Sequence, residues 1–323
     1  MDGFWAKLSS VKTVLTQSPK EAAEFIKHGG IVAFPTETVY GLGANLFDPH
    51  AIRKIFEAKE RPADNPLIAH IGSFDQLQRL VAFISPNAQK LIGAFFPGPL
   101  TIVLKKTAAV PLLATGGLDT IGVRMPRHPI TREFLKACAI TIAAPSANLS
   151  GRPSPTTWQA VHEDLNGRID CILQDDAAEI GLESTVVDCT STIPLLLRKG
   201  AVPLERLREF IPEIREVEGV EADPPKSPGL KHNHYSPRAA VMIVQPDERP
   251  DADSTGAYIG LTERSADFRS ALVCESVDQY AHALFEFFRE CDRVGVDKIF
   301  CEAVPEEGIG AALMDRIRRA AEN

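Results

Sequence analysis

The sequence lacks the segments that anchor a protein in a membrane or export it. A transmembrane helix needs ~20 consecutive apolar residues, and the longest apolar run here covers only residues 137–144. The first segment, MDGFWAKLSS, does not contain the apolar core of a secretory signal. Internal repeats and low-complexity tracts are also missing. We therefore expect a cytoplasmic protein with no membrane partner.

Cysteine pairs of the C-x-x-C type are absent, although six cysteines are spread along the chain. Their scatter argues against a disulfide framework and against a zinc ribbon. We expect them to be reduced, mostly buried and chemically silent. His232 and His234 have the spacing of two metal ligands, but no third ligand lies near them in the sequence. We therefore expect no protein-bound metal ion.

The common glycine-rich loops that bind phosphate groups are absent as well. The chain has no G-x-x-x-x-G-K-[ST] motif, and Gly41-Leu42-Gly43 lacks the third glycine of the dinucleotide-binding motif. If this protein binds ATP, side chains placed along a sheet must bind it.

Charge is distributed unevenly along the 323 residues. Residues 1–212 contain 22 Lys and Arg against 21 Asp and Glu, whereas residues 213–323 contain 13 against 22. The acidic part repels phosphate, so we expect the first part to bind any anionic ligand. A proline-rich segment with few apolar residues begins at residue 213. At ~150 residues per domain, we predict a catalytic domain at 1–212, a linker at 213–238 and a second domain at 239–323.

Short apolar runs rich in β-branched residues alternate with amphipathic stretches, which predicts an α/β fold. In the first part we expect an open, twisted, mixed sheet with strands at 31–34, 66–71, 100–104, 120–123, 140–144, 169–173, 184–189 and 195–197. The expected helices are at 19–27, 49–58, 74–83, 86–95, 129–137, 157–165 and 203–210. The second part predicts a smaller, doubly wound α/β domain with strands at 240–244, 257–261, 271–274 and 298–302 and helices at 278–294 and 310–322.

Polar residues suited to ligand binding gather in five blocks at predicted strand edges and loops. In the first, residues 34–44, we expect the chain to turn through hydroxyl groups and two glycines; alone, this pattern equally fits a turn with capping threonines. In the second, Lys59 and Arg61 could project the same way from an extended segment and suit a polyphosphate. The alternative for this pair is a solvated helix end.

The remaining blocks contain a buried-looking cation and several small polar groups. Arg124 lies in an apolar alternation, where its charge needs a partner that could be a ligand carboxylate. Ser146 and Asn148 share one face of an extended segment and precede further hydroxyl groups and a helix start, which suits an anion or a ribose. The fifth block contributes Ser184 and Arg198.

In this order, the five blocks resemble the threonylcarbamoyl-AMP synthase family. Its lysine-x-arginine and serine-x-asparagine signature appears here as Lys59-Glu60-Arg61 and Ser146-Ala147-Asn148. The resemblance covers roughly residues 10–212 and continues into SPGLKHNHYSP, residues 227–237, which looks like the linker of the family's long form. It implies a YrdC-like catalytic domain, a linker over the active site and a Rossmann-like C-terminal domain.

The resemblance also implies an activity and a set of site residues. Family members join L-threonine, bicarbonate and ATP into L-threonylcarbamoyl-adenylate and release pyrophosphate, with Mg²⁺ accompanying ATP. The product would pass to a downstream tRNA-modifying transferase complex. Lys59 and Arg61 would be catalytic, and threonine would be bound by Thr38, His70, Arg124 and Ser184. The nucleotide would be bound by Lys59, Arg61, Asn65, Thr120, Ser146, Asn148, Ser154, Arg198 and Tyr235.

The sequence leaves open two rival functions and the roles of two glutamates. Carbamoyl transfer occurs on the same domain type in hydrogenase maturation proteins, but those chains carry additional acylphosphatase-like and zinc-finger segments that are not visible here. An RNA-binding module would need a basic stripe interleaved with aromatic residues, which the sequence lacks, although weak RNA binding stays open. Glu37 and Glu183 could bind Mg²⁺ or pair with Arg61 or Arg124. Because a carbamate is labile in water, we expect residues 227–237 to act as a lid.

Overall fold

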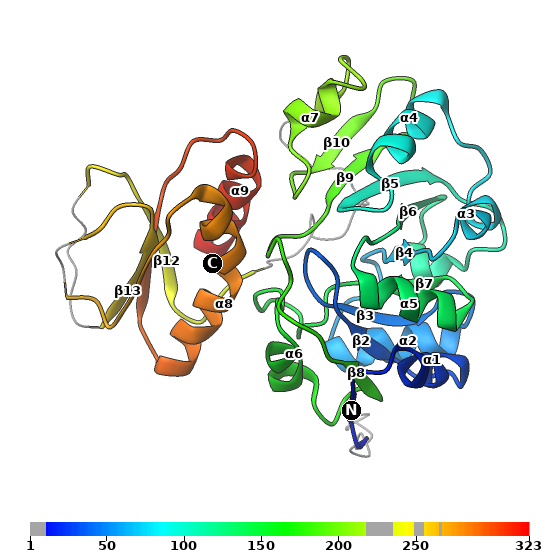
Figure 1. Ribbon diagram of the computed structural model, residues 1–323, viewed down its shortest axis with the longest axis horizontal. Coiled ribbons are helices and arrows are strands. Elements are labelled where there is room, and N and C mark those ends of the chain that lie inside the picture. The colour runs from blue at the N-terminus through cyan, green and yellow to red at the C-terminus, as the bar shows by residue number, and fades with distance from the viewer. Residues whose placement is uncertain (1–10, 218–234, 249–254, 265–266, 323) are drawn as a thin grey trace, which may run out of the picture.

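The computed structural model describes residues 11–217, 235–248, 255–264 and 267–322. Figure 1 shows a large N-terminal body and a smaller C-terminal body side by side. Helices α8 (Val277–Val294) and α9 (Gly310–Ala321) of the smaller body face the large body. Among the described residues, no helix is both long and apolar enough to cross a membrane.

The large body is built on a mixed sheet of eleven strands in the order β1-β8-β2-β3-β7-β4-β6-β5-β9-β10-β11. Pairs such as β4 with β6 are parallel, whereas β3 with β7 and β5 with β6 are antiparallel. The predicted open mixed sheet is therefore confirmed. Its strands are β1 (Val14–Thr16), β2 (Val32–Phe34), β3 (Gly41–Asn45), β4 (Ile68–His70), β5 (Leu100–Lys105), β6 (Thr120–Arg124), β7 (Ile142–Ala144), β8 (Cys171–Leu173), β9 (Thr185–Asp188), β10 (Leu195–Arg198) and β11 (Arg215–Glu216).

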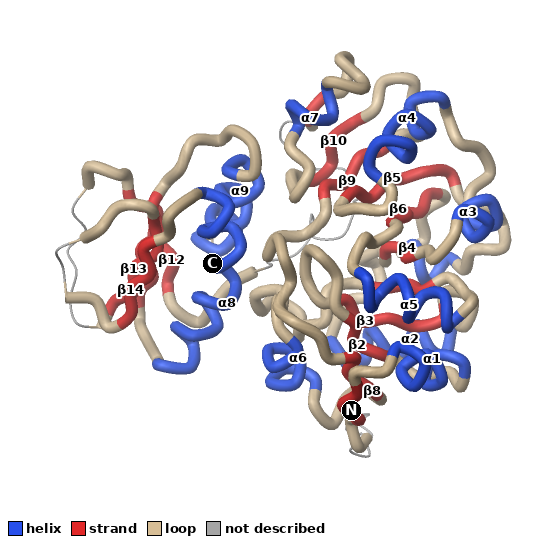
Figure 2. Tube along the Cα trace, in the orientation of Figure 1, coloured by secondary structure: helices blue, strands red, loops and turns tan. Residues whose placement is uncertain are grey.

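Helices cover both faces of this sheet because its strands alternate their apolar side chains (Figure 2). On β2, Val32 and Phe34 pack against α1 and α5, while Ala33 belongs to the core that contains α2 and α6. Proline is at the start of four of these helices, and Ser18 caps α1 by accepting from the Glu21 amide. The helices are α1 (Pro19–Lys27), α2 (Pro49–Lys59), α3 (Phe74–Leu80), α4 (Pro86–Phe95), the 3₁₀ helix η1 (Leu112–Thr115), α5 (Pro129–Cys138), α6 (Trp158–Leu165) and α7 (Leu204–Arg208).

Strand β3 differs from the sequence-based expectation. We expected the chain to turn through Gly41 and Gly43, but both residues are in a central strand. A Cβ atom on Gly43 would lie 2.6 Å from the Ile142 side chain and 2.8 Å from the Phe34 ring. The glycines are therefore needed for close packing between neighbouring strands, not for a turn.

The smaller body has a four-stranded parallel sheet in the order β12-β15-β13-β14. Its elements are β12 (Ala240–Val244), β13 (Gly256–Gly260), β14 (Ser270–Val273), α8 (Val277–Val294), β15 (Lys298–Glu302) and α9 (Gly310–Ala321). Both helices lie on the face of this sheet that is turned toward the large body (Figure 1). A doubly wound domain has helices on both faces, so this expectation is not met among the described residues. A small apolar cluster of Val244, Tyr258, Phe268 and Phe300 is separate from the core that contains the two helices.

The two bodies share a core at their interface. Val39 and Leu182 of the large body are buried in the same cluster as Tyr235 and the apolar faces of α8 and α9. Gly181 lies against the α8 backbone, where an added Cβ atom would come within 2.5 Å of the His282 Cα atom. The two bodies are therefore packed against each other through buried apolar side chains and a close backbone contact.

Candidate active site

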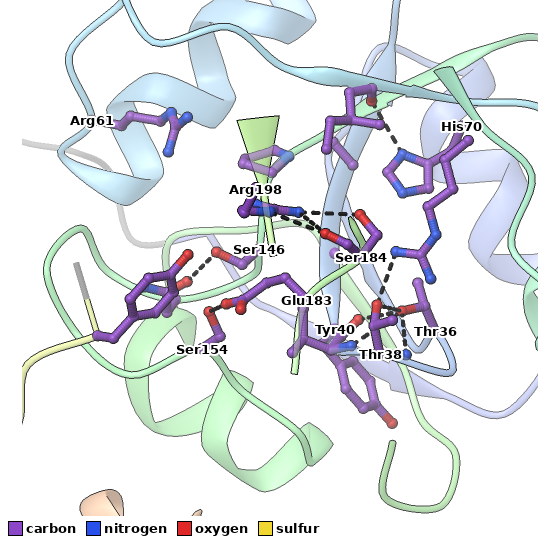
Figure 3. Close-up of a pocket in the computed structure, with 18 of the residues that line it drawn as sticks. Thr36, Thr38, Tyr40, Arg61, His70, Ser146, Ser154, Glu183, Ser184 and Arg198 are labelled. Carbon is purple, nitrogen blue, oxygen red and sulfur yellow. Dashed lines mark hydrogen bonds between the residues drawn. The ribbon is translucent and has the colours of Figure 1, made fainter. Parts of the chain in front are cut away.

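A cavity lies where the ends of several strands of the large sheet meet Tyr235. About 650 Å³ of space not filled by atoms lies in it and over its opening, and this volume includes open solvent. Figure 3 shows side chains from separate strands and loops pointing into this space. The lining residues are Thr36, Thr38, Val39, Tyr40, Gly41, Arg61, Ile68, His70, Arg124, Ala144, Pro145, Ser146, Asn148, Arg152, Ser154, Glu183, Ser184, Arg198 and Tyr235.

Arg124 is at the end of β6 and is buried against one side of the cavity. Its Nη2 atom lies 2.8 Å from Oε1 of the buried Glu37, and its Nη1 atom donates to Thr38 Oγ1 at 2.8 Å. Arg124 Nε makes no hydrogen bond within the described residues. The sequence left open whether Glu37 binds Mg²⁺ or pairs with an arginine, and in the structure it pairs with Arg124.

Thr38 is held by hydrogen bonds to two neighbouring side chains. The Thr36 hydroxyl donates to the Val39 carbonyl oxygen at 2.6 Å. The Thr38 hydroxyl lies 2.8 Å from Thr36 Oγ1, and either oxygen can be the donor of this hydrogen bond. Thr38 thus accepts from Arg124 and shares a hydrogen bond with Thr36, and these two contacts hold its side chain in place.

His70, at the end of β4, is neutral. Its Nδ1 atom lies 3.1 Å from the Ile68 carbonyl oxygen and must carry a proton to donate to it. Burial, with the nearby Arg124 charge, lowers the pKa of His70 to about 3. The other ring nitrogen, Nε2, is therefore an unprotonated acceptor in a cavity-lining residue.

Arg198 and Ser184 form a second anchored pair. Arg198, at the end of β10, donates from Nε and Nη2 to the Ser184 carbonyl oxygen at 3.1 and 2.9 Å. Its Nη2 atom also lies 3.1 Å from Ser184 Oγ, which is 2.8 Å from the Thr101 hydroxyl. The pairing of β9 with β10 holds both residues at one edge of the cavity.

Lys59 lies behind the cavity and is not among its lining residues. It is the last residue of α2, and Glu60 follows with a left-handed φ of 53°, so the extended segment expected for Lys59 and Arg61 is wrong. Lys59 is buried, and its ammonium group donates to the backbone oxygens of Ser146, at 2.6 Å, and of Asn148. Burial, with the charge of Arg61, lowers the pKa of Lys59 well below its usual value. Because Lys59 is buried, the alternative of a solvated helix end is also wrong for it.

The turn after β7 is held from inside by Lys59 and by its own side chains. The Ser146 hydroxyl donates to Asn148 Oδ1 at 2.6 Å, and Asn148 Nδ2 donates to the carbonyl oxygens of Leu149 and Arg152 at 2.7 and 2.9 Å. Ser146 also forms a bridge with Gly41 of β3. The serine-x-asparagine motif is thus a rigid rim of the cavity.

Arg61 lines the cavity, whereas the predicted nucleotide residues Asn65 and Thr120, like Lys59, do not. Arg61 Nη2 is 3.4 Å from the Pro66 carbonyl oxygen, its Nε atom has no described hydrogen-bond partner, and burial lowers its pKa to about 10. Asn65 is buried, and neither of its amide atoms has a described partner. Thr120 begins β6, about 13 Å along the strand from Arg124 at ~3.3 Å per residue.

Ser154 and Tyr235 close the side of the cavity that faces the smaller body. The Ser154 hydroxyl donates to Glu183 Oε1 at 2.6 Å. Glu183 pairs with Arg316 of α9 at 2.8 Å, and not with Arg61 or Arg124 as the sequence had left open. Tyr235 is buried, and its ring stacks on Phe285 of α8 at 5.4 Å. Most of the expected lid, including His232 and His234, lies outside the described residues.

The sequence did not single out Arg152 or Arg316. Arg152 lines the cavity and pairs with Asp164 at 2.7 Å, and Arg316 is fully buried in a helix whose pattern is ordinary amphipathic. Tyr40 belonged to the first block, but its hydroxyl donates to the Asp175 carbonyl oxygen at 3.0 Å and is turned away from the other labelled groups (Figure 3). Only the fold identifies these roles.

All six cysteines are buried and free, and burial raises the pKa of Cys138, Cys171, Cys189 and Cys291 to about 12. Within the described ranges, no group of three or more His, Cys, Asp or Glu residues could hold a metal ion.

Comparisons with known proteins cover both bodies. A family model described as "Telomere recombination" matches residues 24–200, and one described as "Threonylcarbamoyl-AMP synthase, C-terminal domain" matches residues 202–322. The chain is 46% identical to the threonylcarbamoyl-AMP synthase of Pyrococcus abyssi and 40% identical to that of Bacillus subtilis, in each case over 93% of this chain and 92% of the relative. A crystal structure of P. abyssi Sua5 complexed with L-threonine is similar with a TM-score of 0.89 and 44% identity over 97% of both chains.

Proposed function

This chain belongs to the threonylcarbamoyl-AMP synthase family, and we propose that its cavity joins L-threonine, bicarbonate and ATP into L-threonylcarbamoyl-adenylate with release of pyrophosphate. The observation that carries the proposal is the convergence of separate strand ends on one cavity. Arg124 and neutral acceptors lie on one side of it, and Arg61, Arg198, hydroxyl groups and an amide group lie on the other. We retain the proposed division into a catalytic domain at 1–212, a linker at 213–238 and a C-terminal domain at 239–323.

Threonine is proposed to bind beside Arg124, Thr38, His70 and Ser184. A complex with L-threonine is known for the P. abyssi relative, and Arg124 has the planar donor group that suits a carboxylate. Because Glu37 already neutralises Arg124, the ligand carboxylate would share the guanidinium group rather than meet an isolated charge. The unprotonated Nε2 atom of His70 can accept from the threonine hydroxyl or ammonium group.

The chemistry requires positioning and no protein nucleophile. The threonine amine and bicarbonate condense to a carbamate and water. A carbamate oxygen then attacks the α-phosphorus of ATP, the new P–O bond forms, and the bond to pyrophosphate breaks. Holding the two reactants in line and stabilising the phosphate charge supplies the acceleration in such transfers.

The nucleotide is proposed to bind on the opposite side, against Arg61, Ser146, Asn148, Ser154, Arg198 and Tyr235, with Asn65 and Thr120 as outer members of the same set. Lys59 contributes in this proposal by holding the Ser146–Asn148 turn from behind, since its ammonium group is already bound to that turn. Mg²⁺ would arrive as the magnesium complex of ATP. Glu183, the carboxylate that lines the described part of the cavity, is engaged by Arg316, which fits an ion held mainly by phosphates and water.

We propose further that the product passes to a downstream tRNA-modifying transferase complex in the cytoplasm. The family's role supports this, because a labile adenylate has to be consumed by the next enzyme. Weak RNA binding by this chain is part of the same proposal.

The proposed function is tested by measuring pyrophosphate release while threonine, bicarbonate and ATP are omitted in turn. We expect release only when all three are present. Pyrophosphate release that continues without threonine or without bicarbonate would exclude this reaction.

A further inference from the structure

Arg316 of the smaller body forms an ion pair with the cavity-lining residue Glu183. Arg316, on α9, is fully buried, and its Nε atom donates to Glu183 Oε2 at 2.8 Å. Its Nη2 atom donates to the Lys199 carbonyl oxygen at 2.9 Å, and its Nη1 atom contacts its neighbour Asp315. Arg316 thus links α9 to the two segments of the large body that carry Glu183 and Arg198.

Glu183 transmits this contact to the cavity. It lines the cavity, and its second carboxylate oxygen accepts from the Ser154 hydroxyl at 2.6 Å. Burial alone would raise the pKa of Glu183, but the charges of Arg316 and Arg198 lower it overall. An ionised carboxylate can only accept hydrogen bonds. The Ser154 proton is therefore committed to Glu183, and its oxygen lone pairs are left to face a ligand.

Arg316 also holds the aromatic side of the cavity. Its guanidinium group lies over the Tyr235 ring at 5.1 Å from the ring centre, and Phe285 of α8 stacks on the same ring. Tyr235 has a left-handed φ of 74°, which is uncommon for a residue with a side chain. Contacts from both helices of the smaller body thus keep this ring at the cavity wall.

A second buried arginine fixes the neighbouring backbone. Arg289 of α8 donates to the Pro153 carbonyl oxygen at 2.6 Å and to Asp164 at 2.8 Å. The Ser154 segment is therefore restrained through its backbone by Arg289 and through its side chain by the Arg316–Glu183 pair.

We propose that Arg316 is a positioning residue of the nucleotide half of the site, which acts through Glu183 on Ser154 and directly on Tyr235. The smaller body is then a structural part of the active site. This inference rests on the proposed function, because it takes Ser154 and Tyr235 as nucleotide contacts. It further predicts that Ser154 accepts a hydrogen bond from the nucleotide, for example from a ribose hydroxyl, and does not donate one to a phosphate.

The experiment compares Arg316→Met, which removes the charge and keeps a long side chain, with Arg316→Lys. The matched control is Arg318→Ala, on the same helix, which removes an exposed ion pair with Glu306. The melting temperature, kcat and the KM values for ATP and threonine are measured for each protein. We expect Arg316→Met to raise KM for ATP about tenfold, as expected when a buried charged partner is removed, and to change KM for threonine less than about twofold. Arg316→Lys should lie between it and the wild type.

Ser154→Ala distinguishes positioning from a general loss of stability. If Arg316 acts through Ser154, the Arg316→Met change should raise KM for ATP less in the Ser154→Ala background than in the wild type. A lower melting temperature with an unchanged KM for ATP would reduce Arg316 to a domain-docking residue and overturn the proposal. Equal effects on KM for ATP in both backgrounds would overturn the route through Ser154.

Two further measurements keep the result decisive. If Arg316→Met does not fold, Arg316→Lys and Glu183→Gln take its place, and normal ATP affinity in both would overturn the proposal.

Calorimetric binding of a non-hydrolysable ATP analogue reports on the nucleotide half without turnover. If the wild-type protein binds the analogue but releases no pyrophosphate from ATP with threonine and bicarbonate, only the proposed function is contradicted. If Arg316→Met binds the analogue with the wild-type affinity, only the present inference is contradicted.

Discussion

Lys59 allows the sharpest test of how the site is built. The structure places its ammonium group on the backbone oxygens of Ser146 and Asn148, behind the cavity wall. Lys59→Met keeps the length and the apolar stem of the side chain but removes every donor. The carbonyl groups of the Ser146–Asn148 turn then lose a charged partner in a largely buried place.

The size of the effect follows from these contacts. A hydrogen bond to a charged group is worth about 1.5–3 kcal/mol, and part of the loss of two such bonds is offset because a buried ammonium group is no longer desolvated. We expect a net loss of about 2–4 kcal/mol in the free energy of unfolding. At ~2–4 °C per kcal/mol for a domain of this size, the melting temperature should fall by about 5–15 °C.

The assay combines thermal unfolding with steady-state kinetics. Lys54→Met is the control, because Lys54 is on the same helix and also donates to a carbonyl oxygen, that of Gly29, but at an exposed position. We expect Lys59→Met to lower the melting temperature and to raise KM for ATP together, and the control to do neither. An unchanged melting temperature with a strongly reduced kcat would contradict the structural role of Lys59 and would indicate direct contact with the phosphates.

The remaining predictions concern the two halves of the cavity. Arg124→Lys should raise KM for threonine by about 10–100-fold, because a lysine cannot form the planar two-donor contact. The control Arg127→Lys, which changes an exposed ion pair, should leave this KM unchanged. If Arg124→Lys had the same KM for threonine as the wild type, Arg124 would not belong to the threonine site. Lowering the pH from 7 to 5 should reduce the free energy of unfolding of His70→Phe by about 2 kcal/mol less than that of the wild type, because His70 takes up a proton on unfolding below its unfolded pKa of ~6.5. Urea unfolding at both pH values measures this difference. Equal losses of stability in the two proteins would contradict it. Ser154→Ala should raise KM for ATP by about 3–10-fold through one lost hydrogen bond, measured by pyrophosphate release, and an unchanged value would argue against a nucleotide contact.

Much of the fold was predictable because its elements carry local signals. Helices α1 and α4 occupy the predicted bounds, each beginning at a proline after a serine cap. Strand β3 was not predicted, because glycine at positions 41 and 43 is typical of turns and only the packing of Phe34 and Ile142 explains it. β11 was missed because two exposed polar residues carry no strand pattern.

The candidate site was predictable where its residues follow strands. Ser146, Asn148, Ser184 and Arg198 line the cavity because they lie at or beside strand ends that the sheet brings to one place. The geometry of Lys59 was not predictable, since it depends on the left-handed turn at Glu60. Arg316 could not be found from the sequence at all. Its partner Glu183 lies 133 positions away, and only the docking of α9 brings the two together.

If the proposed function is correct, one cavity brings threonine, bicarbonate and ATP together. The most direct measurement supplies isotopically labelled bicarbonate with unlabelled threonine and ATP, and determines the mass of the adenylate by mass spectrometry immediately after mixing. We expect a threonyl adenylate derivative that carries the labelled carbon between the threonine nitrogen and the phosphate. An adenylate without the label, such as threonyl-adenylate, or a product without threonine would contradict it.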